Sequence, residues 1–75
     1  MFFYIETYSE KDTKDIVDLP IGELLPHIKS KVDNPDVVVY DYADGMYLFF
    51  DTKGLVGSAV EITSYEEEQL YRERL

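Results

Sequence analysis

The residue types that most often perform chemistry are sparse in this chain of 75 residues. His27 is the only histidine, and the chain has no cysteine that a histidine could activate. The serines lack the glycine-flanked strand–turn–helix context of a nucleophile elbow. We therefore interpret His27 as a structural or surface residue, and we expect the protein not to be an enzyme.

The sequence also gives little support for a metal-binding or phosphate-binding site. Without cysteine and with one histidine, the chain lacks the usual zinc ligands. Asp33-Asn34-Pro35-Asp36 lacks the alternating ligand spacing and the closing glutamate of a calcium loop. Gly54-Leu55-Val56-Gly57 lacks the lysine and the following helix of a phosphate-binding loop. We expect no metal and no cofactor.

Aromatic side chains interleaved with carboxylates are the best candidates for a binding site. The chain is 15% aromatic, and tyrosine is common in protein interfaces because it buries a large area at low entropic cost. At alternating positions of neighbouring strands, such rings share one face of a sheet. The predicted partner-binding residues are Tyr4, Glu6, Tyr40, Asp41, Tyr42, Tyr47, Phe49 and Asp51.

Most of these residues belong to a predicted β-hairpin over residues 37–51. Asp44-Gly45 separates two runs of β-branched and aromatic residues, which is typical of a two-residue turn. This turn pairs Tyr40 with Phe49 and separates two faces. The expected core face consists of Val37, Val39, Leu48 and Phe50. The aromatic face consists of Tyr40, Tyr42, Tyr47 and Phe49. Either a partner covers the aromatic face, or the C-terminal helix or residues 9–18 cover it within the monomer.

The remaining strands lie on either side of the hairpin in the sequence. Residues 1–8 are rich in strand formers, with Phe3 and Ile5 on one face. Residues 9–15 are polar and predict a loop, and residues 16–17 predict a short bridge or edge strand. Residues 55–62 form the third strand of a meander, in one of two registers. A two-residue Lys53-Gly54 loop places Gly57 and Ala59 on the core face, whereas a three-residue loop with a bulge places Val56, Ser58 and Val60 there.

Two helices complete the prediction. The stripe that indicates the first consists of Ile21, Leu24, Leu25, Ile28 and Val32. Asp18 is its expected N-cap, and residues 33–35 are expected to end it. Pro26 interrupts it, so we expect a kink there, or a 3₁₀ turn followed by a helix that begins at Pro26. Ser64 and Glu67 match a capping box that begins a short C-terminal helix.

These elements predict one α+β domain over residues 1–75. We expect a three- or four-stranded antiparallel sheet, built from the N-terminal strand and the 37–62 meander. One amphipathic helix packs on this sheet, and the short C-terminal helix follows it.

The net charge of the chain limits the classes of partner that it is expected to bind. Sixteen Asp and Glu against seven Lys and Arg give a net charge of −9, which disfavours direct binding to nucleic acid or to anionic membranes. No apolar run reaches the length of a membrane span, and residues 1–6 lack the features of a signal peptide. We expect a cytoplasmic protein whose acidity either serves solubility alone or attracts a basic partner.

The leading hypothesis is a small acidic, non-enzymatic protein-binding module. It would act as an inhibitor or regulator by occupying a basic, nucleic-acid-binding surface of a protein partner. Small acidic inhibitors from phages and mobile elements, some of which mimic DNA, share this size and charge, and the analogy extends no further. The alternative is a structural or assembly protein: an obligate homodimer or small oligomer that joins through the aromatic face or an open sheet edge.

Overall fold

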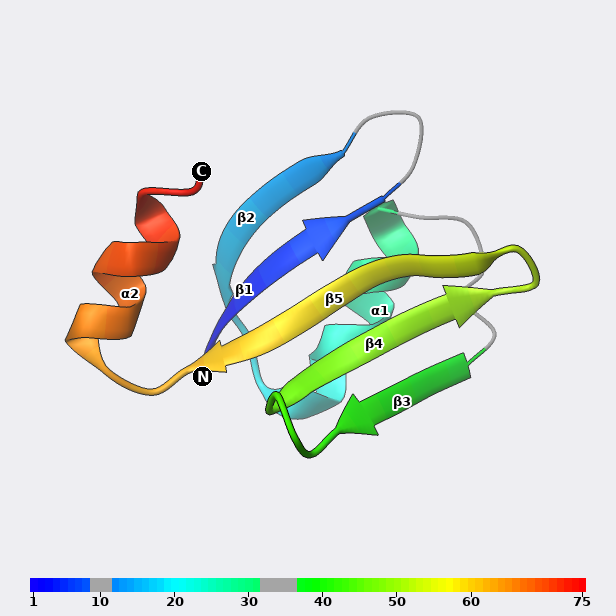
Figure 1. Cartoon of the computed structure of the whole chain (residues 1–75), viewed down its shortest axis with the longest axis horizontal. Helices are drawn as coiled ribbons and strands as arrows, with labels where there is room; N and C mark the ends of the chain where they lie inside the picture. The colour runs from blue at the N-terminus through cyan, green and yellow to red at the C-terminus, as the bar shows by residue number, and fades with distance from the viewer. Residues whose placement is uncertain (9–11, 32–36) are drawn as a thin grey trace.

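The computed structural model describes residues 1–8, 12–31 and 37–75. Within this part of the chain, a five-stranded antiparallel sheet has the strand order β2-β1-β5-β4-β3 (Figure 1). The strands are β1 (Phe2–Thr7), β2 (Thr13–Asp18), β3 (Val37–Asp41), β4 (Met46–Asp51) and β5 (Gly54–Ile62). A 3₁₀ turn, η1 (Ile21–Glu23), leads into α1 (Leu24–Lys31), and α2 (Tyr65–Arg72) follows β5. The predicted α+β class is confirmed.

Three or four strands were predicted and the sheet has five, because β2 is a full strand of six residues. It pairs with β1 from Phe2↔Asp18 to Thr7↔Thr13, so the prediction that residues 13–15 belong to a loop is wrong. An edge strand needs few apolar residues, since one side and part of both faces meet water. Because β2 is mostly polar, its sequence did not indicate a strand.

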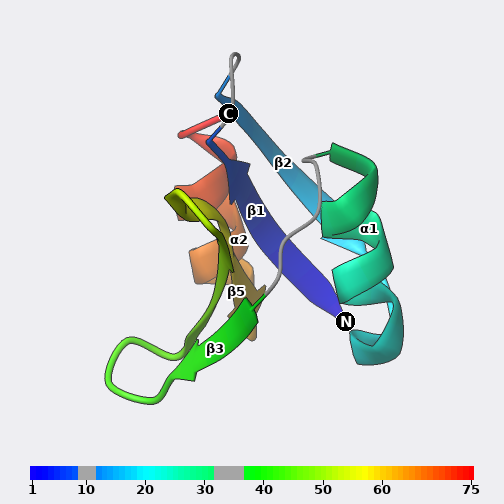
Figure 2. The same cartoon turned by 90° about the vertical axis from the view of Figure 1, so that its right-hand side faces the viewer.

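One face of the sheet is covered by α1, and α2 lies on the other side of the sheet (Figure 2). Beneath α1, the buried core consists of Phe3, Ile5, Leu24, Ile28, Phe49 and Ala59. We call this the α1 face, and the opposite one the open face, because in Figure 1 no helix lies over β3, β4 and β5 on that side. The α1 face of the sheet is therefore packed against a helix, whereas the open face is covered only in part.

The helix prediction is correct in outline, with a shifted boundary. The 3₁₀ turn η1 precedes α1, which begins at Leu24 and not at Pro26. Pro26 lies in the first turn of α1, where a backbone N–H has no partner within the helix, so its missing N–H costs little. Asp18 belongs to β2 and does not cap the helix. The predicted end of the helix and its last apolar residue, Val32, fall outside the described residues.

The hairpin forms with a register different from the one predicted. Tyr40 pairs with Tyr47, not with Phe49, because the loop spans residues 42–45. Gly45 has a φ of +64°, the left-handed conformation that the sequence predicted for this glycine. A shift of two positions leaves the side-chain parity unchanged, so the two predicted faces of the hairpin are correct.

The assignment of these faces to core and surface is wrong. Phe49 is buried under α1 with 1% of its surface exposed, whereas Val37 and Val39 belong to the open face. A β-bulge lies between Phe49 and Phe50, and before it Phe49 pairs with Gly57 and Tyr47 with Ala59. Since Ala59 also pairs with Ile5, these rings share the face on which β1 is buried under α1.

The pairing of β4 with β5 is that of the predicted register with a bulge: Leu48 pairs with Ser58, Phe49 with Gly57 and Tyr47 with Ala59. Gly57 and Ala59 are nevertheless on the α1 face, because α1 covers the face of the hairpin opposite to the one predicted. A Cβ atom at Gly57 would lie 3.0 Å from the backbone oxygen of Glu6. The absence of a side chain at Gly57 therefore allows the close approach of β1.

Candidate functional site

The predicted partner-binding residues occupy three separate places in the fold. Tyr4 and Glu6 lie on the open face of β1, whereas Tyr40 and Tyr47 lie on the α1 face of β3 and β4. Phe49 belongs to the core. The expectation of one continuous aromatic face is wrong, because the pairing of β1 and β4 with β5 sends these rings to opposite sides of the sheet.

Tyr4 and Glu6 belong to a cluster that attaches α2 to the sheet. The Tyr4 ring is 3% exposed and stacks on Tyr71 of α2, with ring centroids 4.6 Å apart. Its hydroxyl donates to Glu6 Oε1 at 2.8 Å, and the Tyr8 hydroxyl donates to Glu6 Oε2 at 2.9 Å. Burial, together with the hydrogen bond to Glu6, raises the pKa of Tyr4 to about 12. Burial also raises the pKa of Tyr8.

The same cluster borders a polar cleft between α2 and the open face. The Arg74 guanidinium lies 5.0 Å from the centroid of the Tyr71 ring, a cation–π distance. The cleft has a volume of about 190 Å³, and Glu6, Asp44 and Ser58 are among its polar lining residues. Both Glu6 oxygens already accept tyrosine hydroxyls, so this carboxylate serves the attachment of α2.

At the other edge of the sheet, three tyrosines form an aromatic cluster. The Tyr40 ring lies 4.8 Å from both the Tyr42 ring and the Tyr47 ring, measured between centroids. Tyr42 is 88% exposed, and Tyr47 is partly buried against the core, where it meets Phe3 edge-on at 6.5 Å. This part of the predicted site is thus accessible at its outer end.

The two predicted aspartates each accept hydrogen bonds from the turn that follows them. Asp41 Oδ1 accepts from the backbone N–H groups of Ala43 and Asp44 at 3.0 and 3.3 Å. Asp51 Oδ1 accepts from those of Lys53 and Gly54 at 2.7 and 3.1 Å. These are Asx turns, which stabilise the start of a loop. Because both side chains are only partly buried, their charges still reach solvent.

An exposed apolar stretch in β3 includes two residues, Val37 and Val39, that the sequence prediction had placed in the core. Four consecutive residues of β3 expose both faces of the strand: Val37 (52%), Val38 (42%), Val39 (44%) and Tyr40 (41%). β3 pairs with β4 on one side, and no described strand pairs with its other side. We call this stretch the β3 edge. The signal in the sequence was three successive valines without the apolar–polar alternation of a strand that has one buried face.

An apolar groove lies beside the β3 edge, between β3 and the helical layer. It has a volume of about 190 Å³ and is lined by Ile21, Leu24, Leu25, Val38, Tyr47 and Phe49. Ile21 and Val38 are both exposed, so the groove is accessible from solvent. Its volume is below the roughly 300 Å³ at which small-molecule pockets begin.

The sequence around the β3 edge carries charge of one sign. Every charged residue from position 32 to position 52 is an aspartate: Asp33, Asp36, Asp41, Asp44 and Asp51. Asp41 ends β3, whereas Asp51 ends the neighbouring strand β4, directly after Phe50, the partner of Val37. The β3 edge therefore has its own carboxylate at Asp41, and Asp51 lies one strand away from its other end.

No protein-family model, no curated protein and no solved structure matches this chain. In the described ranges, no group of three or more histidine, aspartate and glutamate side chains is arranged to hold a metal ion. No helix among the residues placed by the structure is long and apolar enough to span a membrane.

Proposed function

We propose that this chain is a non-enzymatic protein-binding module that binds a partner with a basic surface through the β3 edge. The observation that carries the proposal is the exposure of four consecutive apolar residues, Val37 to Tyr40, on both faces of an edge strand. Exposed apolar surface of this kind is a common mark of a protein interaction site.

The charge supports a basic partner. Every charged residue from position 32 to position 52 is an aspartate, and the whole chain carries −9. An acidic surface increases the rate of encounter with a basic surface and repels nucleic acid and anionic lipid. An inhibitor or regulator that occupies a nucleic-acid-binding surface, as some phage and mobile-element proteins do, would combine these properties.

Affinity capture with matched variants tests this proposal. The full chain is immobilised and exposed to an extract of its native cells, alongside Val38→Lys on the β3 edge and Ile16→Lys on β2. Both variants add one positive charge to an edge strand, at exposed Val38 on β3 and at partly buried Ile16 on β2. We expect a protein that the original chain and Ile16→Lys retain, that Val38→Lys loses, and that about 1 M salt releases. Equal retention by all three chains, or retention of no protein, would contradict the proposal.

Homodimerisation is the second candidate, and it relies on the same observation. Antiparallel pairing of two β3 strands about Val39 would place apolar residues of one copy beside those of the other. The net charge of −9 on each copy opposes this arrangement. Sedimentation velocity at several concentrations separates the two candidates: a dimer that Val38→Lys dissociates favours assembly, and a monomer at high concentration rejects it.

A further inference from the structure

The two edges of the sheet differ in how they are protected against another strand. β2 presents Lys14, Asp15 and Asp18, and edge charges discourage pairing with a foreign strand. β3 presents Val37, Val38 and Val39, with no charged residue before Asp41. Backbone N–H and C=O groups on the outer side of β3 have no partner strand in the described residues. The fold thus permits strand addition at β3.

A strand added beside β3 would lie about 4.8 Å away, with its side chains alternating between the two faces. Those directed to the α1 face would lie next to Val38 and over the apolar groove. Those directed to the open face would lie next to Val37 and Val39. A groove of about 190 Å³ suits one large apolar side chain better than a free small molecule.

The aspartates select among possible strands. Asp41 ends β3 and Asp51 ends the neighbouring strand β4 near the start of β3, so a partner strand with Lys or Arg at its ends meets one carboxylate beside it and a second one strand away. Antiparallel pairing of two copies about Val39 would place Asp41 of each copy opposite Val37 of the other, a carboxylate against an apolar side chain. This mismatch and the net charge of −9 on each copy disfavour self-pairing.

We propose, on the basis of the function proposed above, that the β3 edge receives an extended segment of the partner as a sixth strand. The segment has apolar side chains at alternating central positions and Lys or Arg at its ends. One apolar side chain enters the groove beside Val38. Backbone hydrogen bonds with β3 provide much of the affinity, and the charges determine which segments bind.

Selection from a displayed library of random peptides tests the proposal. Peptides of about nine residues are long enough to cover β3 and both of its ends. The full chain is the target, and peptides that also bind Val38→Lys are removed. We expect enrichment of peptides with apolar residues at i and i+2 and with flanking Lys or Arg. Enrichment of acidic or uncharged peptides, or of none, would overturn the proposal.

Variants of the chain then test each contact by fluorescence anisotropy with the best synthetic peptide. Val38→Ser removes apolar surface from the groove and should raise Kd about tenfold, whereas Ile16→Ser on β2 should leave it unchanged. The double variant Asp41→Asn/Asp51→Asn should raise Kd about threefold and reduce its salt dependence. Asparagine keeps the Oδ1 acceptor of each Asx turn, so this variant removes charge without removing the turn.

Backbone methylation of the peptide tests strand addition directly. N-methyl groups on alternate residues block one edge of a strand, and those on the other residues block the opposite edge. One methylated set should abolish binding and the other should have little effect. Equal effects of the two sets, or insensitivity to Val38→Ser, would reject strand addition. A peptide-free dimer that Val38→Ser dissociates would identify a second copy as the occupant and also reject the proposal.

These outcomes are distinct from failure of the proposed function. If capture yields a partner that Val38→Lys loses, but no selected peptide responds to N-methylation, then protein binding stands and strand addition is wrong. If capture yields no partner, the proposed function itself fails.

Discussion

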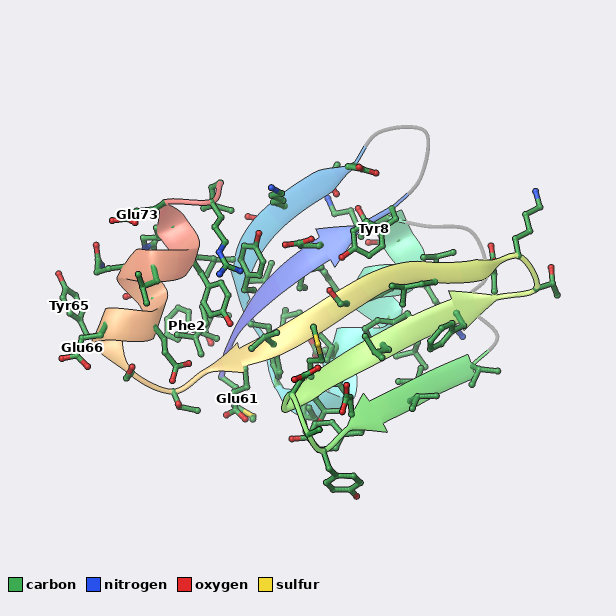
Figure 3. The ribbon with its side chains drawn as sticks, in the orientation of Figure 1. Phe2, Tyr8, Glu61, Tyr65, Glu66 and Glu73 are labelled. Carbon is green, nitrogen blue, oxygen red and sulfur yellow. The ribbon has the colours of Figure 1, made fainter. Side chains whose placement is uncertain are left out.

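The two flanks of this sheet are built from similar strands but are completed in different ways. On the β1–β2 flank, Phe3 and Ile5 are buried under α1, and Tyr4 is buried against Tyr71 of α2. In Figure 3, the Phe2 side chain also lies between α2 and the start of β1, while Tyr65 points away from the sheet. On the β3 flank, no described helix covers the open face, and β3 is exposed on both faces.

This difference shows which strands are buried in a short chain that has few apolar residues. A small domain buries a smaller fraction of its surface than a large one does. Here the two helices cover the centre and one flank, and the outer strand on the other flank remains uncovered. The uncovered strand is the place where a partner would complete the fold.

The largest expected effect is on stability, and it compares one residue from each flank. Phe3→Ala removes a fully buried ring and should lower the free energy of unfolding by about 3–5 kcal/mol. Val39→Ala, on the exposed β3 edge, should lower it by less than about 1 kcal/mol. Urea unfolding followed by circular dichroism measures both. Similar losses for the two variants would show that β3 is as well packed as β1.

We expect an intermediate effect when charged residues on the β2 edge are replaced by valines like those of β3. Lys14→Val/Asp15→Val removes two exposed charges and adds apolar β-branched residues. We expect concentration-dependent self-association, measured by sedimentation velocity. Lys14→Gln/Asp15→Asn is the matched control, because it removes the same charges without adding apolar surface. If the valine variant stays monomeric, charge on β2 is not what protects this edge.

The smallest expected effect concerns the tyrosine cluster of the closed flank at alkaline pH. The pKa of Tyr4 is raised from 10.0 to about 12, so folding favours the protonated phenol. The resulting stability is fully present below pH 10 and is lost as the pH rises from about 10 to about 12. Tyr4→Phe has no such group, so its urea midpoint should decline less over this range than that of the original chain. Parallel declines would show that Tyr4 does not ionise differently in the folded state.

Local patterns in the sequence predicted most of the elements. The stripe of Leu24 and Ile28 indicated α1, and Gly45 indicated the turn of the hairpin. The Ser64 cap also forms, with Ser64 Oγ accepting from the backbone N–H of Glu67 at 3.1 Å. These features depend on residues close together in the chain, and such interactions are encoded locally.

The candidate site was less predictable, since it depends on the register between distant strands. Tyr40, Asp41 and Tyr42 were correctly placed in the hairpin, but Phe49 was expected at the surface and lies in the core. Val37 and Val39 were expected in the core and lie exposed. A register with a bulge was one of the two predicted, but no local pattern indicated which face of the hairpin α1 would cover.

By itself, the sequence determined the α+β class, the parity of the hairpin and the acidic charge near Val37–Tyr40. Only the tertiary structure decided which face of the hairpin α1 covers and which strand is left at the apolar edge. The physical reason is that parity follows from the alternation of side chains along one strand. The choice of buried face, in contrast, depends on the pairing of β4 with β5 and of β5 with β1, which places Phe49, Ala59 and Ile5 on one face under α1.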